Sequence, residues 1–225
     1  MAQGYFVTGT DTGVGKTLVA CALLHGFAAA GRTVVGMKPV VAGRERGRWR
    51  DIDALLRAST APVERDLASP YAFEPAIAPH IAADLVGVPI EIERIAGAYS
   101  ELARRADVVI VEGVGGWLVP LNEQQTSADL AARLGLPVVL VVGMRLGCLN
   151  HALLTRRQID ASGLRCAGWV ANCAFPGFSE LQANIRALES RLGSPLLGVI
   201  PHLRGADPLT AAEFLSPALV AEASA

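Results

Sequence analysis

The sequence contains few cysteines and carries little net charge. Its four cysteines, among 225 residues, form no Cys-x-x-Cys pair and lie in apolar stretches, so neither a zinc site nor a disulfide framework is expected. We predict that all four are buried, reduced thiols. Lysine and arginine number 20 against 21 acidic residues, and a formal charge of -1 gives no broad positive field to collect nucleic acid. The sequence therefore disfavours zinc-binding, disulfide-rich and nucleic-acid-binding proteins.

Long apolar runs and targeting segments are missing as well. The longest apolar stretches are roughly ten residues, about half of what a bilayer-spanning helix needs. The first five residues show none of the features of a signal peptide. We therefore expect a cytoplasmic protein that binds no membrane. Hydrophobic residues make up 52% of the chain and charged residues 18%, a balance that argues against intrinsic disorder.

Short, continuously apolar runs alternate with longer amphipathic segments along most of the chain. The runs are expected to be strands buried on both faces, and they cover Tyr5 to Gly9, Thr33 to Met37, Val108 to Val111, Val138 to Val142, Cys166 to Ala171 and Leu196 to Ile200. Helices are expected at about 16–30, 92–105, 127–134, 149–161 and 179–192, with stops at Gly31, Gly135 and Gly163. This alternation predicts an α/β fold: one doubly wound domain over residues 1–225, with a mostly parallel sheet and helices on both faces.

The stretch from about 43 to 89 interrupts this rhythm. Its apolar periodicity is weak, prolines recur, and it begins with the basic run Arg44-Glu45-Arg46-Gly47-Arg48-Trp49-Arg50. We expect an irregular excursion here. It is either a solvated segment with one short helix near Ile52 to Ser59 or a functional lid or substrate loop.

A glycine-rich segment, Gly9-Thr10-Asp11-Thr12-Gly13-Val14-Gly15-Lys16-Thr17, joins the first expected strand to a helix. It offers what a bound phosphate needs: backbone N–H groups, a helix N-terminus, a lysine, and a hydroxyl for Mg²⁺. Five residues separate Gly9 from Gly15, where the usual pattern has four. Its place at a strand-to-helix turn nevertheless favours nucleotide binding over a merely structural glycine turn. We therefore predict a P-loop NTPase type of fold.

Charged residues follow two other expected strands. Glu112 ends the strand that begins at Val108 and precedes the glycine-rich run 113–116, while Lys38 follows the strand that ends at Met37. Ligands of open α/β sheets bind at these carboxyl ends. Glu112 could therefore hold Mg²⁺ or cap a turn, and Lys38 could be catalytic or merely solvated.

Three further polar residues are less decisive. Asp51 and Asp53 could each complete the oxygen shell of Mg²⁺, and the residue types alone do not separate them. Asn172, at the carboxyl end of another expected strand, could present a donor and an acceptor to the edge of adenine or could simply lie in a turn.

Six blocks of sequence together resemble the dethiobiotin synthetase family of biotin biosynthesis, in order and spacing. They are Gly9 to Thr17, Lys38-Pro39-Val40, Val111 to Gly116, Leu146 to His151, Gly168 to Asn172 and Gly198 to Pro201. The resemblance implies an ATP- and Mg²⁺-dependent cyclo-ligase that carboxylates 7,8-diaminononanoate (7,8-diaminopelargonate) with CO₂. The carbamate would attack the γ-phosphate of ATP, and the neighbouring amine would then close the ureido ring, giving dethiobiotin, ADP and phosphate.

By matching position, the resemblance also implies roles for individual residues. Lys16 and Lys38 would be catalytic, and Thr17, Asp53 and Glu112 would ligate Mg²⁺. The nucleotide site would comprise Gly13, Val14, Gly15, Lys16, Thr17, Leu18, Glu112, Gly113, Gly115, Asn172, Pro201, His202 and Leu203. The substrate would contact Thr12, Lys38, Ala42, Gly116, Cys148, Leu149 and Asn150. In this family the turn that holds the last three belongs to the partner subunit, which implies a homodimer.

Two positions depart from the family pattern, and another class of protein shares the expected fold. Ala42 stands where some members carry serine, and Gly13 where some carry glutamate. The alternative is a regulatory ATPase of the partitioning or septum-positioning kind. Such proteins place a second lysine five positions before the phosphate-binding lysine, where this chain has Asp11. They often carry a basic C-terminal helix, whereas residues 209–225 contain no lysine or arginine, so both differences favour the ligase.

Overall fold

The computed structural model describes residues 2–203 and 205–216. Most of the C-terminal segment 209–225, which contains no lysine or arginine, therefore lies outside the described residues. Its main sheet has six strands in the order β2-β5-β1-β6-β7-β8. These are β1 (Gln3–Gly9), β2 (Val34–Met37), β5 (Val108–Glu112), β6 (Val138–Gly143), β7 (Cys166–Asn172) and β8 (Leu196–Ile200). Each neighbouring pair is parallel. All six expected strands are confirmed, with ends that shift by at most two residues.

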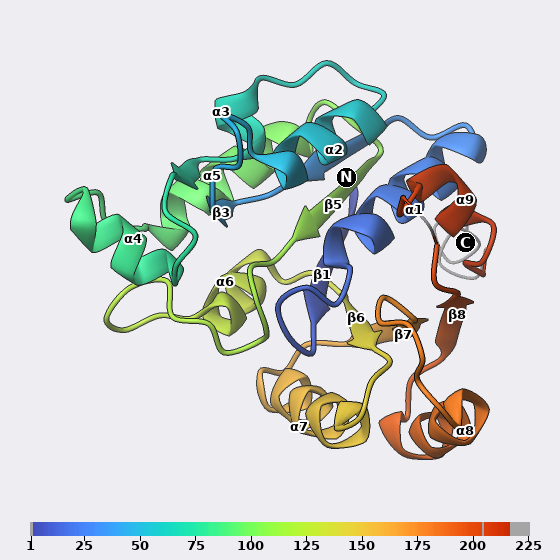
Figure 1. Ribbon diagram of the computed structural model, residues 1–225. Coiled ribbons are helices and arrows are strands. Elements are labelled where there is room, and N and C mark those ends of the chain that lie inside the picture. The colour runs from blue at the N-terminus through green and yellow to red at the C-terminus, as the bar shows by residue number, and fades with distance from the viewer. Residues whose placement is uncertain (1, 204, 217–225) are drawn as a thin grey trace.

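Helices cover both faces of the sheet (Figure 1). One face packs against α1 (Lys16–Ala29), α2 (Arg50–Ala58) and α9 (Pro208–Ala212), and the other against α5 (Ile92–Leu102), α6 (Ser127–Leu134), α7 (Cys148–Ala161) and α8 (Leu181–Leu192). A further helix, α4 (Pro79–Leu85), adds Ala82 and Ala83 to the hydrophobic cluster of the second face. Because successive strand residues point to opposite faces, Val108 and Ile110 enter the first core while Val109 and Val111 enter the second. This confirms the doubly wound α/β fold.

The excursion is more regular than the sequence predicted. Besides α2, it contains α3 (Arg65–Ala68), β4 (Tyr71–Phe73) and α4, and β4 pairs with β3 (Val40–Ala42), which directly precedes the excursion, in a second, two-stranded parallel sheet. The buried aromatic residues Tyr71 and Phe73 fasten this small sheet to the main core. The helix expected near Ile52 to Ser59 is present as α2, but the short elements after it were missed, because three-residue strands carry too little periodicity to be recognised from sequence.

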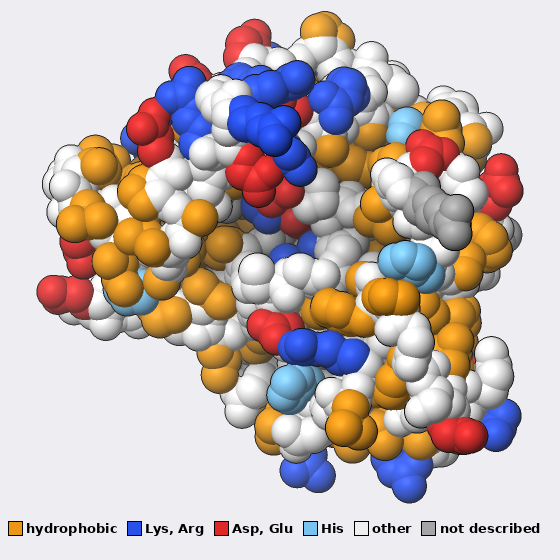
Figure 2. Space-filling model, viewed as in Figure 1, with side chains coloured by type: hydrophobic (Ala, Val, Ile, Leu, Met, Phe, Trp, Pro, Cys, Tyr) orange, Lys and Arg blue, Asp and Glu red, His pale blue; other side chains and the backbone are white. Residues whose placement is uncertain are grey.

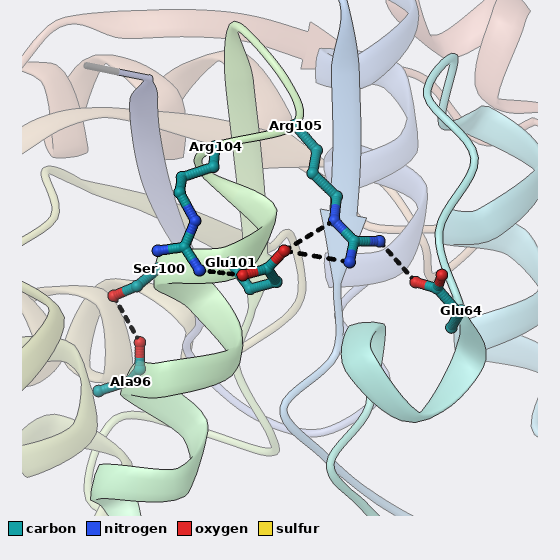
Figure 3. A network of polar contacts seen from close by, with 6 residues as sticks. All are labelled: Glu64, Ala96, Ser100, Glu101, Arg104 and Arg105. Atoms are coloured by element: carbon teal, nitrogen blue, oxygen red, sulfur yellow. Dashed lines mark hydrogen bonds and ion pairs between the residues drawn. The ribbon is translucent and has the colours of Figure 1, made fainter.

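A surface network joins the excursion to α5. Arg105 contacts Glu64 at 2.7 Å and Glu101 at 3.1 Å, and Glu101 also pairs with Arg104 (Figure 3). Exposed pairs of this kind contribute little individually, about 0–1 kcal/mol. The network therefore orients α3 against α5, while the buried aromatic side chains of the excursion supply most of the stabilisation.

The four cysteines are in the state that the sequence predicted. Cys21, Cys148, Cys166 and Cys173 are all buried and free, as predicted. No helix within residues 2–203 and 205–216 is both long and apolar enough to cross a membrane.

Candidate active site

The segment between β1 and α1 curls into a loop at the carboxyl edge of the sheet. Gly13 and Gly15 have φ angles of +74° and +92°, and a Cβ atom on Gly15 would collide with the side-chain amide of Asn172. The Lys16 Nζ donates to the carbonyl of Asp11 at 2.9 Å. Backbone N–H groups and the N-terminus of α1 therefore converge on one point, as a phosphate site requires.

A buried ion pair lies beside this loop. The Lys38 Nζ is 2.6 Å from the Glu112 Oε1 and donates to the carbonyl of Gly113 at 3.1 Å. The Thr17 hydroxyl donates to the same Glu112 oxygen at 2.9 Å. Lys38 and Glu112 are 4% and 1% exposed. Sequence reasoning expected all three side chains at one edge of the sheet, and the structure brings them together.

The second oxygen of Glu112 has unused bonding capacity. Its Oε2 is buried and has no hydrogen-bond partner among the described residues. Leaving a buried carboxylate oxygen unpartnered is costly, so such an atom points to a missing ligand. Hydroxyl and carboxylate oxygens are the ligands that Mg²⁺ takes from proteins, with phosphate and water oxygens supplying the rest. Thr17 and Glu112 therefore fit a magnesium site.

The pKa values of the two lysines shift in opposite directions. Burial, followed by the neighbouring charge of Lys38, lowers the pKa of Lys16 to about 8. Burial by itself would lower the pKa of Lys38, but Glu112 and Asp51 outweigh it and raise that pKa above its ordinary value. Lys38 is consequently a fixed positive charge at neutral pH.

The structure places Asp51, and not Asp53, at this cluster. Both lie in the first turn of α2, where residues two apart point about 200° away from each other around the helix axis. The Asp51 carboxylate is 3.3 Å from the Lys38 Nζ. Asp53 instead accepts from Arg48 at 2.8 Å and from Arg65 at 2.5 Å, one on each oxygen. Guanidinium groups therefore occupy both oxygens of Asp53, and metal ligation by Asp53 stays a prediction, with Asp51 as the α2 carboxylate that lies at the cluster.

Asn172 has a role that the sequence did not predict. Its amide nitrogen donates to the carbonyl of Val14 at 2.7 Å, so the side chain fastens the phosphate loop to the end of β7. A contact between this residue and adenine stays a prediction. Pro201, His202 and Leu203 follow β8 at the same edge, and Leu203 packs on the hydrophobic cluster that also receives Leu18.

A cavity of about 830 Å³ opens beside Lys38. Its charged end contains Lys16, Lys38, Asp51 and Glu112. The rest of its wall is largely apolar and comes from the excursion and from the loop after β5: Val41, Ala42, Ala76, Ile77, Ala78, Pro79, Val114 and Val119. Thr12, Gly13 and Gly115 line it as well. A charged end with two lysines and with carboxylates that could hold a metal, beside an apolar wall, suits a ligand that carries a metal-bound phosphate next to a hydrocarbon chain.

Other predicted substrate residues lie elsewhere in the chain. Cys148, Leu149 and Asn150 begin α7, and none of these three lines the cavity beside Lys38. Gly116 also lies outside that lining, and its carbonyl accepts from the Ser127 hydroxyl at 3.2 Å. The predicted substrate residues thus form two separate groups within one subunit.

One contact at the edge of the site was missed from the sequence. Arg145 pairs with Asp11 of the phosphate loop at 2.5 Å, and its guanidinium carbon lies 5.1 Å from the ring centre of Phe175. The separation of 134 positions between Asp11 and Arg145 hid the pair. It ties the phosphate loop to the segment that leads into α7.

Comparison with known proteins adds close relatives. A family model described as an AAA domain matches residues 3–210. The ATP-dependent dethiobiotin synthetase of Nitrosospira multiformis is 54% identical, covering 100% of this chain and 99% of its own. Those of Aromatoleum aromaticum and Xylella fastidiosa are 52% and 48% identical, over 95% and 96% of this chain and 96% and 97% of theirs.

Solved structures with a similar fold are much more distant in sequence. The septum site-determining protein MinD of Pyrococcus horikoshii superposes with a TM-score of 0.56 at 17% identity, covering 94% of this chain and 86% of that one. The cell division ATPase MinD of Pyrococcus furiosus gives 0.55 at 20% identity, covering 92% and 85%. At such identities the likeness establishes the fold alone.

Proposed function

This chain belongs to the ATP-dependent dethiobiotin synthetase family, and from that premise we propose that it converts 7,8-diaminononanoate, CO₂ and ATP into dethiobiotin, ADP and phosphate. Membership makes it a ligase of biotin biosynthesis. The observation that carries the proposal is the position of Lys38. It lies between the phosphate loop and an apolar-walled cavity, as a residue that serves both ATP and an aliphatic diamine would.

The proposed reaction has three steps. One amine of the diamine attacks CO₂ and loses a proton, giving a carbamate. A carbamate oxygen attacks the γ-phosphorus of ATP and releases ADP, giving a carbamic-phosphoric anhydride. The second amine attacks the carbonyl carbon of that anhydride, and phosphate leaves as the five-membered ureido ring closes.

Positioning and charge neutralisation dominate phosphoryl transfer, and this chain supplies both. Lys16 and the loop N–H groups hold the β- and γ-phosphates. Lys38, kept protonated by its acidic neighbours, stabilises the carbamate and the transferring phosphoryl group. The apolar wall that includes Ala42 covers the hydrocarbon chain of the diamine. At Ala42 a methyl group stands where some family members have a hydroxyl, so the side chain at that point would bind the substrate by van der Waals contact and not by a hydrogen bond.

We assign Mg²⁺ to Thr17, Asp51 and Glu112. When bound, the ion would neutralise charge on the β- and γ-phosphates. The unpartnered Oε2 of Glu112 and the position of Asp51 against Lys38 support this set. Phosphate and water oxygens would complete the shell of the ion.

The two aspartates of α2 should behave differently when each is changed to asparagine. Asp51→Asn is expected to raise the Mg²⁺ concentration for half-maximal activity about tenfold or more, since a charged ligand is lost, with little change in melting temperature. Asp53→Asn should instead lower the melting temperature, because Arg48 and Arg65 lose their shared carboxylate. Magnesium titration of activity together with thermal unfolding checks both. The reverse assignment, with Asp53→Asn showing the larger magnesium effect, would return the metal to Asp53.

We also propose a homodimer in which the turn at Cys148, Leu149 and Asn150 reaches the partner's cavity. The two groups of predicted substrate residues, separate within one subunit, support this arrangement. Exposed apolar side chains lie near the turn and on α4. Leu146, 94% exposed, precedes the turn, and Ile81 and Leu85 project from α4. Figure 2 shows hydrophobic side chains gathered over α4.

Charge at the exposed leucine should separate the subunits. Leu146→Glu is expected to give a monomer by light scattering and to raise the KM for the diamine at least about tenfold, while ADP binding stays near normal. Leu209→Glu, at an exposed leucine on α9, is the matched control and should leave the mass unchanged. A wild-type protein with the mass of one chain would refute the shared site.

The decisive experiment for the proposed function measures phosphate release from Mg·ATP with and without 7,8-diaminononanoate and bicarbonate, and follows the organic product by mass spectrometry. We expect release that requires the diamine and yields one dethiobiotin per phosphate. Hydrolysis independent of the diamine, with no such product, would favour a switch ATPase. We place the reaction in the cytoplasm, where ATP is available and the four free cysteines stay reduced.

A further inference from the structure

A second cavity, of about 540 Å³, adjoins the first. Its inner wall is the first turns of α1, through Thr17, Leu18 and Cys21, together with residues 205–208. Thr17, Glu45 and Asp51 also line the cavity beside Lys38, so the two cavities share part of their wall. Besides the carboxylates of Glu45, Asp51 and Asp53, the lining carries four arginines, which we call the arginine wall: Arg46, Arg48, Arg50 and Arg57. In Figure 2, Lys and Arg side chains gather along the upper rim of the central hollow, in front of α2.

Half of the arginine wall already has partners. Arg48 pairs with Asp53, and Arg50 pairs with Glu45 at 2.9 Å. Arg46 and Arg57 have no hydrogen-bond or ion-pair partner within the described part of the chain. These two guanidinium groups are therefore available to an anion that enters the cavity.

Arg46 sits in a tight turn that fixes its backbone. The N–H of Glu45 donates to the carbonyl of Arg48 at 2.9 Å, and the N–H of Arg48 returns a bond to the carbonyl of Glu45 at 3.0 Å. The two residues between them, Arg46 and Gly47, have φ angles of +48° and +78°, as in a type I′ turn. Glycine, asparagine or aspartate is favoured at the first of these positions, so an arginine there is strained. Strain of this kind is retained where a side chain has a use.

The direction of a bound nucleotide identifies the anion. A P-loop cradles the α- and β-phosphates with its own N–H groups, its lysine reaches the β- and γ-phosphates, and its serine or threonine meets the metal. The α-phosphate is thus the end of the phosphate chain away from the lysine, next to the start of the following helix, which here is Thr17 and Leu18. Both residues line the second cavity, so the α-phosphate would be the phosphate nearest to the arginine wall.

We propose that Arg46 and Arg57 bind the α-phosphate of the nucleotide from the side opposite the phosphate loop. The inference rests on the nucleotide site of the proposed function but not on the ring-closing reaction. It makes the arginine wall a determinant of affinity for any nucleoside di- or triphosphate, whichever base it carries.

The test measures Mg·ADP binding by calorimetry. Arg46→Gly removes the guanidinium and relieves the left-handed backbone, so its melting temperature should not fall. Combined with Arg57→Ala, it is expected to raise the Kd for ADP about tenfold, since charge-assisted hydrogen bonds are lost. AMP, whose one phosphate is the α-phosphate, should lose affinity by a similar factor in a competition assay. Arg44→Ala is the matched control: Arg44 lies in the same segment but pairs with Glu74, stacks on Trp49 and lines neither cavity.

Each result has one meaning. An ADP Kd within twofold of wild type in the double variant would overturn the inference, as would an equal effect of Arg44→Ala, which would indicate only a general loss of positive charge. ADP weakened with AMP unaffected would move the contact to the β-phosphate and also overturn it. A wild-type protein that binds ADP but makes no dethiobiotin would refute the proposed function and leave the arginine wall intact.

Discussion

Lys16→Ala is expected to reduce turnover by about 10³-fold or more, the largest loss of activity predicted for any single residue of the site. Lys16 is 7% exposed, and within residues 2–203 and 205–216 its Nζ bonds to a backbone carbonyl of the phosphate loop and to no carboxylate, so its charge is available to a ligand. Its removal leaves no buried carboxylate without a counter-ion. The melting temperature without nucleotide should therefore stay close to that of the wild type.

Steady-state kinetics and thermal unfolding, run on the same preparations, check this expectation. Arg186→Ala removes one positive charge from the exposed surface of α8 and serves as the control, with normal turnover expected. Turnover of Lys16→Ala within tenfold of the wild type would remove the phosphate-binding assignment of the loop.

Lys38→Ala is expected to lose both activity and stability. Glu112, 1% exposed, would be left as a buried charge without its partner, a change that costs about 3–5 kcal/mol of unfolding free energy. Turnover should fall more than ATP affinity, because Lys38 acts on the carbamate and the phosphoryl group in transit. Mg²⁺ should raise the melting temperature of this variant more than that of the wild type, since the ion replaces the missing positive charge beside Glu112.

The double variant Lys38→Met with Glu112→Gln separates the two losses. It removes both charges, so most of the stability should return while activity stays low. Denaturant unfolding and kinetics provide the comparison. Recovery of activity along with stability would show that Lys38 serves only the fold, and a larger effect on ATP affinity than on turnover would make it a nucleotide-binding residue.

The sequence predicted the main sheet well because its strands are buried on both faces and read as continuous apolar runs. The glycine stops at Gly31, Gly135 and Gly163 were also right, since each has a positive φ after its helix. Prediction from the sequence failed in the excursion. There, a three-residue strand is held by the packing of its own aromatic side chains on the distant main core, and no local pattern reports such tertiary contacts.

At the site, residues placed by strand ends were predictable and residues placed by side-chain pairing were not. Lys38 and Glu112 follow or end buried strands, so topology alone brings them to one edge. Asp51 and Asp53 could not be distinguished in this way. Which of them lies at the cluster depends on the side of α2 that faces Lys38 and on the arginines that pair with Asp53. The hydrogen bond from Asn172 to the phosphate loop was hidden for the same reason.

The long reach of the site's hydrogen bonds has a consequence for folding kinetics. The bond from Thr17 to Glu112 spans 95 residues, and that from Asn172 to Val14 spans 158. Contacts between such distant segments form only after large loops have closed, so they belong to the slow part of folding. Recovery of ADP binding after dilution from denaturant should consequently lag behind recovery of helical circular dichroism. ADP binding would thus report completion of the central sheet. Protein that refolds in the presence of ADP would gain no stability from the ligand until that last stage.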